Sequence, residues 1–135
     1  MPKRRRGSRH AYRVRSHVPF ERLVERALAA IPSPFREHLA EVAIVIDDEP
    51  TPDQLRENDL EPDSGLYGIY EGVPRTEYGA DWVAMPNRIT LFRLPLEEDF
   101  PDPDDLAEEV RITVIHELAH HMGIDDDRLE ELGID

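Results

Sequence analysis

The chain has 135 residues, the length of a single domain with a modest hydrophobic core. It has no cysteine, which excludes a disulfide framework and thiolate metal ligands, so only His, Asp and Glu side chains remain to hold a metal. The formal net charge of −14 disfavours contact with nucleic acid over most of the surface.

The charge is distributed unevenly along the chain. Residues 1–15 hold seven of the sixteen Lys and Arg residues and no acidic residue, so nine basic and thirty acidic side chains remain in residues 16–135. We therefore expect a basic, disordered tail over residues 1–15, followed by one domain over residues 16–135. The alternative, a tail that contacts a phosphate backbone, lacks the basic folded face or stacking aromatics that usually accompany it.

The sequence shows no targeting or membrane signal. No apolar run follows the basic N-terminus, as a secretory signal would require, and no stretch approaches the roughly eighteen apolar residues of a membrane span. We expect a cytoplasmic protein with no membrane partner.

The first predicted element is an amphipathic helix over residues 19–31, ended by Pro32 and Pro34. A short helical turn is predicted over residues 35–40. The helix prediction depends on apolar residues that recur at intervals of three and four, namely Phe20, Leu23, Val24, Ala27, Leu28 and Ile31.

Three strands are predicted in the middle of the chain. Residues 42–46 form a β-branched run typical of a buried strand, and residues 66–72 form a second strand whose glycines indicate a close backbone approach. Residues 88–93 alternate polar and apolar, which favours a half-buried strand at a sheet edge. Residues 51–63 are expected to be loop with a helical turn at 52–56, and residues 73–85 a long loop or flap.

The strongest helix signal covers residues 102–123. Asp102 can cap the helix, Pro103 suits its first position and Gly123 can adopt the left-handed conformation that ends it. Such a helix is about 30 Å long at 1.5 Å per residue. A wide apolar arc predicts that it is buried; the arc comprises Leu106, Ala107, Val110, Ile112, Val114, Ile115, Leu118, Ala119 and Met122.

The remaining sector of this helix holds Thr113, His116, Glu117 and His120. Histidines at i and i+4 lie one turn apart on one face, at the spacing where two imidazoles share a tetrahedral metal. Glu117 points to the side of the pair, so it can reach a metal-bound water without binding the metal. The opposing interpretation is a helix with two solvated histidines and a surface glutamate. His121 lies at another helical angle, which favours a core residue or one that orients a ligand.

The run from His116 to Asp126 resembles the zincins with an HExxHxxGxx(H/D) site. In them the residue three past the glycine completes the metal site, which implies Asp126 as third ligand where most have His; Asp125 and Asp127 remain alternatives. The closer resemblance is to a bacterial family of small zincin-like metallopeptidases with a minimal zincin fold. Residues 67–72 and 86–93 also carry it.

The elements predict an α+β domain, with a small mixed or antiparallel sheet and both helices packed on one face. The resemblance implies a zinc metallopeptidase that hydrolyses peptide bonds of a peptide or protein substrate. His116, His120 and Asp126 would hold Zn²⁺, and Glu117 would act as general base on the zinc-activated water. An edge strand, either 88–93 or 66–71, would pair with extended substrate.

Two questions stay open at this stage. Tyr67, Tyr70 and Tyr78 are the candidates for holding an oxyanion, and Trp82 is expected to pack in the core or flap. The alternative function is a non-catalytic zinc-binding protein that regulates or binds a partner, with a purely structural metal site. Glu117 discriminates between the two, because a structural site has no use for a glutamate between its histidines.

Overall fold

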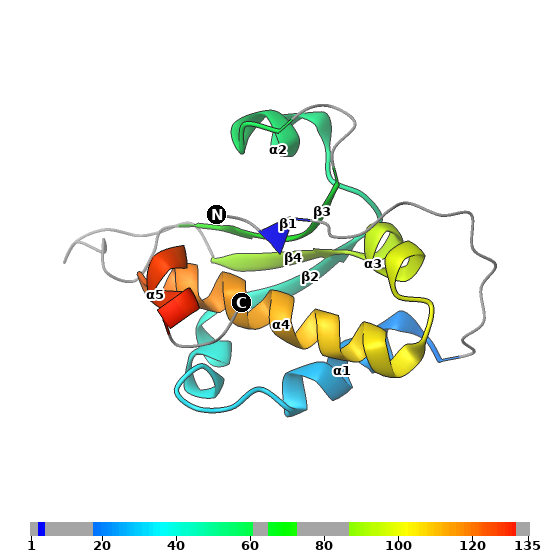
Figure 1. Ribbon diagram of the computed structural model, residues 1–135, viewed down its shortest axis with the longest axis horizontal. Coiled ribbons are helices and arrows are strands. Elements are labelled where there is room, and N and C mark those ends of the chain that lie inside the picture. Colours follow the sequence, from blue (N-terminus) through cyan, green and yellow to red (C-terminus); the bar gives the residue numbers. More distant parts are fainter. Residues whose placement is uncertain (1–2, 5–17, 61–64, 73–86, 132–135) are drawn as a thin grey trace.

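The computed structural model describes residues 3–4, 18–60, 65–72 and 87–131 (Figure 1). Its elements, in chain order, are β1 (Lys3–Arg4), α1 (Phe20–Ala29), the 3-10 helix η1 (Arg36–Glu41), β2 (Ala43–Asp47), α2 (Pro52–Glu57), β3 (Leu66–Glu71), β4 (Arg88–Phe92), α3 (Arg93–Asp99), α4 (Pro103–His121) and α5 (Asp126–Glu131). The predicted long loop over residues 73–85, with Tyr78 and Trp82, lies outside the described residues.

The strands form one mixed sheet in the order β1-β3-β4-β2. β3 pairs antiparallel with both β1 and β4, whereas β2 and β4 are parallel. The α+β prediction is therefore confirmed. Two details of it are wrong: β4 is an interior strand with four of its five residues buried, and β2, predicted to be buried, is a partly exposed edge strand.

The reason for the first error is that both faces of the sheet are covered. As predicted, α4 and α1 lie together on one face, while α2 lies on the other (Figure 1). Leu55 of α2 forms a small apolar cluster there with Leu66, Ile69 and Phe92. A strand covered on both faces is buried at successive positions, whatever alternation its sequence shows.

Helix α4 is the central element, and the prediction of its bounds is confirmed. The Asp102 carboxylate accepts hydrogen bonds from the backbone N–H groups of Asp104 and Asp105, and Gly123 has a φ of 81° just past the helix. Helix α1, η1 and α2 also form where helical structure is predicted. Helix α3 was not predicted, although Pro95 lies in its first turn, where a missing N–H costs little.

The N-terminal segment differs from the expectation of a disordered tail. Lys3 and Arg4 form β1, and Lys3 is buried. Residues 5–15 lie outside the described part of the chain. Both β1 and β3 contact α4, so Lys3 and Arg4 lie beside the helix that carries His116 and His120.

Gly68 sets how closely β3 approaches α4. A Cβ atom at this position would lie 2.7 Å from Thr113 Cγ2 on α4 and 3.2 Å from the Thr90 carbonyl oxygen on β4. Real Cβ atoms do not approach other atoms at the first of these distances, so a side chain at position 68 would push the helix from the strand. The predicted close backbone approach in residues 66–72 is confirmed at this glycine.

We expect Gly68→Ala to lower the free energy of unfolding by roughly 1–3 kcal/mol, the usual cost of overpacking a filled core. Urea unfolding followed by circular dichroism measures the change. Thr113→Ser removes the Cγ2 atom that the new methyl would meet, so the double variant should recover part of the loss. Additive effects of the two substitutions would contradict the proposed contact.

Candidate metal centre

The polar face of α4 gathers His116, Glu117 and His120 at one place. One metal-ligating atom from each lies within 4.8 Å of the others, and the two imidazole centroids are 4.9 Å apart. This is the one such group of three found within the described ranges. The histidine side chains keep 12% and 17% of their surface exposed, whereas that of Glu117 is fully buried.

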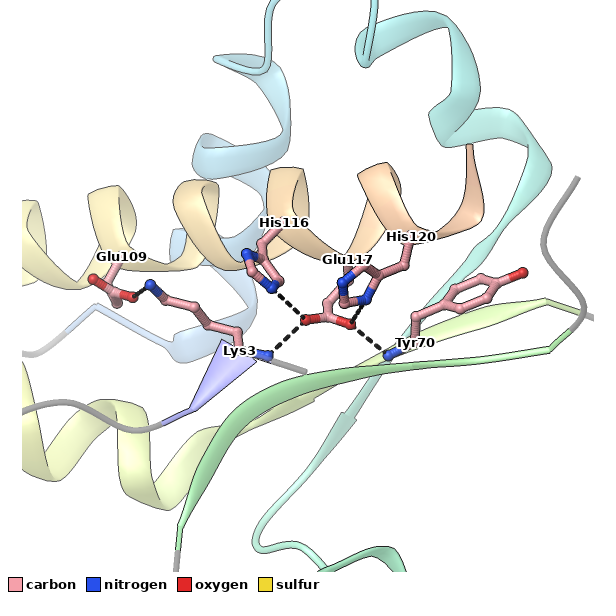
Figure 2. Close-up of polar contacts among 6 residues, drawn as sticks. All are labelled: Lys3, Tyr70, Glu109, His116, Glu117 and His120. Carbon is pink, nitrogen blue, oxygen red and sulfur yellow. Dashed lines mark hydrogen bonds and ion pairs between the residues drawn. The ribbon is translucent and has the colours of Figure 1, made fainter. Parts of the chain in front are cut away.

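The Glu117 carboxylate is held by the backbone of two strands (Figure 2). Oε1 accepts the Tyr70 N–H of β3 at 2.9 Å, and Oε2 accepts the Lys3 N–H of β1 at 2.7 Å. A buried carboxylate is costly unless such donors satisfy it. The opposing interpretation of a solvated surface glutamate is therefore wrong.

The same carboxylate faces both histidines. Its Oε1 lies 3.2 Å from His120 Nδ1, and its Oε2 lies 4.0 Å from His116 Nε2. Because α4 fixes the spacing and the strands fix the carboxylate, the two histidines and Glu117 lie together at one place.

The residues present fit a zinc ion by their chemistry. Neutral imidazole nitrogens and carboxylate oxygens are the ligands that zinc takes when no cysteine is available. Two histidines one turn apart, both partly open to solvent, supply two positions. Glu117, held against β3 beside both histidines, would be placed to act on a water bound to such an ion.

The third ligand remains a prediction. Asp126 begins α5, one short turn beyond Gly123, but its side chain lies outside the described part of the structure. Of its rivals, Asp125 uses its carboxylate to accept the Arg128 N–H at 2.9 Å at the start of α5, and Asp127 is exposed. The choice among Asp125, Asp126 and Asp127 therefore stays a prediction, with Asp126 the residue that the resemblance implies.

His121 is a buried residue that points away from this group, as predicted. Its Nε2 lies 2.7 Å from Glu41 Oε1, and its Nδ1 lies 3.1 Å from the Tyr70 hydroxyl. His121 thus joins α4 to η1 and to β3. It is linked to the metal centre through Tyr70, whose backbone N–H holds Glu117.

The hydroxyls of two of the three tyrosines suggested for an oxyanion contact other polar groups. The Tyr67 hydroxyl donates to Asp99 Oδ2 at 2.7 Å, on the side of α3. The Tyr70 hydroxyl lies 2.9 Å from Asn87 Oδ1 and, in Figure 2, is turned away from the histidine pair. Both hydroxyls bind other polar groups in this structure, and an oxyanion role for Tyr67, Tyr70 or Tyr78 stays a prediction.

Two charged residues near the centre, Glu109 and Lys3, are not predicted from the sequence. Glu109 is buried on α4, and Lys3 reaches it from β1, with Lys3 Nζ 3.7 Å from Glu109 Oε2. Glu109 precedes His116 by seven residues, so helical periodicity places it on the same face two turns earlier. That spacing could have identified Glu109, whereas no local pattern places Lys3.

The chain matches the model of the zincin-like metallopeptidase family over residues 39–134. Because the match spans more than half of the chain and includes His116, Glu117 and His120, the protein belongs to this family. A search of curated proteins found no significant match. No helix within the described residues is long and apolar enough to cross a membrane.

Metal analysis tests the centre directly. We expect about one zinc per chain in the wild type and a loss of zinc in His116→Ala and His120→Ala, since each removes a ligand. Zinc should raise the melting temperature of the wild type alone among these three, because binding to the folded state stabilises it.

His121→Gln is the matched control on the same helix. Its ring contacts Glu41 and Tyr70, so the variant should unfold at lower temperature yet keep its zinc. Zinc retained by both alanine variants, or lost only from His121→Gln, would contradict the assignment of the ligands.

Proposed function

We propose that the protein is a zinc-dependent peptidase that hydrolyses peptide bonds of a peptide or protein substrate, with Glu117 as the general base. The family supports a zinc peptidase in general. The observation that carries the proposal is the position of Glu117: a fully buried carboxylate, oriented by two backbone N–H groups, beside two histidines that retain contact with solvent.

Zinc, when bound, supplies Lewis acidity that polarises the scissile carbonyl and makes water acidic enough to lose a proton near neutral pH. His116, His120 and Asp126 would hold it. Glu117 accepts the proton of the attacking water and passes it to the amine nitrogen that leaves. Water thus adds to the carbonyl carbon, the C–N bond breaks, and the amine departs with its proton.

The backbone contacts of Glu117 suit this role. The Tyr70 N–H fixes Oε1, so the carboxylate cannot rotate away from the histidines. A general base must lie within hydrogen-bond reach of the proton it takes, and a preset geometry avoids reorganisation during the reaction.

The sheet supports β3 as the strand that pairs with extended substrate. Of the two candidate strands, β4 is interior, with β3 and β2 on either side, so its backbone groups are already used in the sheet. β3 borders the metal centre through Tyr70, and among the described residues the two-residue β1 covers its other side. A peptide that adds to β3 would therefore lie across Glu117.

The alternative, a partner-binding protein with a purely structural zinc site, accounts for the histidines but not for Glu117. A structural site needs closed coordination and no carboxylate held beside the ligands. Burial of that carboxylate between α4 and two strands costs free energy that an apolar residue at position 117 would avoid.

Glu117→Gln tests the proposal. We expect zinc content to stay at about one equivalent, while cleavage of a mixed peptide library falls roughly 10²- to 10⁴-fold, the usual contribution of a general base. Mass spectrometry of the library measures cleavage, and metal analysis is run on the same samples.

Glu108→Gln is the control, since Glu108 is an exposed glutamate on the same helix. Arg111 donates two hydrogen bonds to it, which lower the pKa of the Glu108 carboxyl. This variant should keep full activity. Zinc in the wild type without any cleavage would favour the partner-binding function, and equal cleavage by wild type and Glu117→Gln would refute the role of Glu117.

A further inference from the structure

The N-terminal strand β1 occupies the place where a substrate strand would pair. It lies antiparallel to β3, with Lys3 opposite Gly68 and Arg4 opposite Leu66. Without β1, β3 would be an edge strand, whose unpaired N–H and C=O groups accept an added strand. The chain therefore places its own extended segment on the strand that borders the metal centre.

The backbone of Lys3 contacts the proposed base itself. Its N–H donates to Glu117 Oε2 at 2.7 Å, a buried hydrogen bond between residues 114 positions apart. In the proposed reaction Glu117 passes a proton to the leaving amine nitrogen. A substrate residue that contacted Glu117 in the same way through its leaving nitrogen would be the residue on the carboxyl side of the cleaved bond, so Lys3 corresponds to that residue.

The side chain of Lys3 identifies what such a residue would carry. It runs along α4, away from the histidines, to Glu109 (Figure 2). Lys3 Nζ lies 3.7 Å from Glu109 Oε2, and the two side chains are only 8% and 3% exposed. Glu109 precedes Glu117 by two helical turns, about 12 Å at 1.5 Å per residue, a span that a long basic side chain bridges.

A carboxylate buried at this depth is costly unless hydrogen-bond donors or a cation compensate its charge, and at Glu109 Lys3 supplies a cation. Removal of one partner from a buried ion pair leaves an uncompensated charge, which is far more costly than the loss of an exposed pair. The neighbouring Glu108 is exposed and already paired with Arg111, so it does not need a cation from the chain that lies beside β3. Glu109 thus distinguishes a basic occupant from a neutral or acidic one.

We propose that Glu109 is the specificity-determining residue of the place that β1 occupies beside β3 and α4, and that it selects peptides with Lys or Arg on the carboxyl side of the cleaved bond. Lys3 mimics that residue and competes with substrate for this place. The inference rests on the proposed peptidase function for the cleavage step, but the selection of a basic side chain is testable by binding alone.

The test uses two fluorescent peptides that are identical and neutral except for one central residue, Lys or Gln. Binding is measured by anisotropy on the full-length protein without added metal, and cleavage on the same protein after zinc loading. The protein variants are wild type, Lys3→Gln, Lys3→Gln/Glu109→Gln and the matched control Lys3→Gln/Glu108→Gln.

We expect Lys3→Gln to bind the Lys peptide about tenfold more tightly than the Gln peptide, as interactions with a charged partner commonly provide. The wild type should bind the Lys peptide more weakly than Lys3→Gln does, because Lys3 competes. Glu109→Gln should abolish the preference, and Glu108→Gln should preserve it. Cleavage should fall on the amino side of the lysine.

Equal binding of the two peptides by Lys3→Gln, no binding of either, or a preference that survives Glu109→Gln would overturn the inference. Selective binding without cleavage would leave it standing and refute the peptidase function instead. Cleavage without a preference for lysine would refute the selection by Glu109 and leave the peptidase function standing. If circular dichroism shows that the Glu109 variant is unfolded, the comparison of wild type with Lys3→Gln still tests whether Lys3 competes with the Lys peptide.

Discussion

The structure depends on one buried carboxylate. Glu117 projects from the middle of α4 and accepts backbone hydrogen bonds from two different strands, Tyr70 on β3 and Lys3 on β1. Each such bond to a charged group is worth about 1.5–3 kcal/mol, and leaving the charge unsatisfied would cost at least as much. The carboxylate therefore fixes helix and sheet relative to each other at the point where the histidines lie. The same constraint that holds the fold orients the proposed base.

This arrangement explains why α4 carries a line of buried polar residues. Glu109, Thr113 and Glu117 follow at intervals of four, all buried and all on the side of β3 and β1. Thr113 meets Gly68, where the missing side chain lets the helix approach the strand. The charged residues on either side of this contact have different partners. Glu117 lies at the metal centre, and Glu109 pairs with the side chain of Lys3.

Local sequence predicts the bounds of the elements in this protein better than it predicts which other elements pack against them. The bounds of α4 follow from Asp102 and Gly123, because capping and the left-handed turn involve only adjacent residues. The position of β4 does not follow from residues 88–92, since its burial depends on α2, which covers the far face of the sheet. A pattern of alternation describes one strand, whereas burial belongs to the whole sheet.

The residues of the candidate site also differ in whether local sequence predicts them. His116, Glu117 and His120 are recognisable because helical periodicity brings them to one face. Glu109 has the same periodicity, but a glutamate is usually exposed, and nothing nearby shows its partner. That partner, Lys3, comes from a segment whose composition indicates disorder, and it is placed only by pairing with β3. Composition records the average tendency of the tail and not the contacts of two of its residues.

The most direct test of the central claim is a crystal structure of the zinc-loaded protein with an anomalous difference map at the zinc edge. We expect a single zinc peak bound by nitrogens of His116 and His120 and by the Asp126 carboxylate. Glu117 should stay on the backbone N–H of Tyr70, beside the ion but not bound to it. A zinc ion bound directly by Glu117, or a peak away from both histidines, would contradict the account.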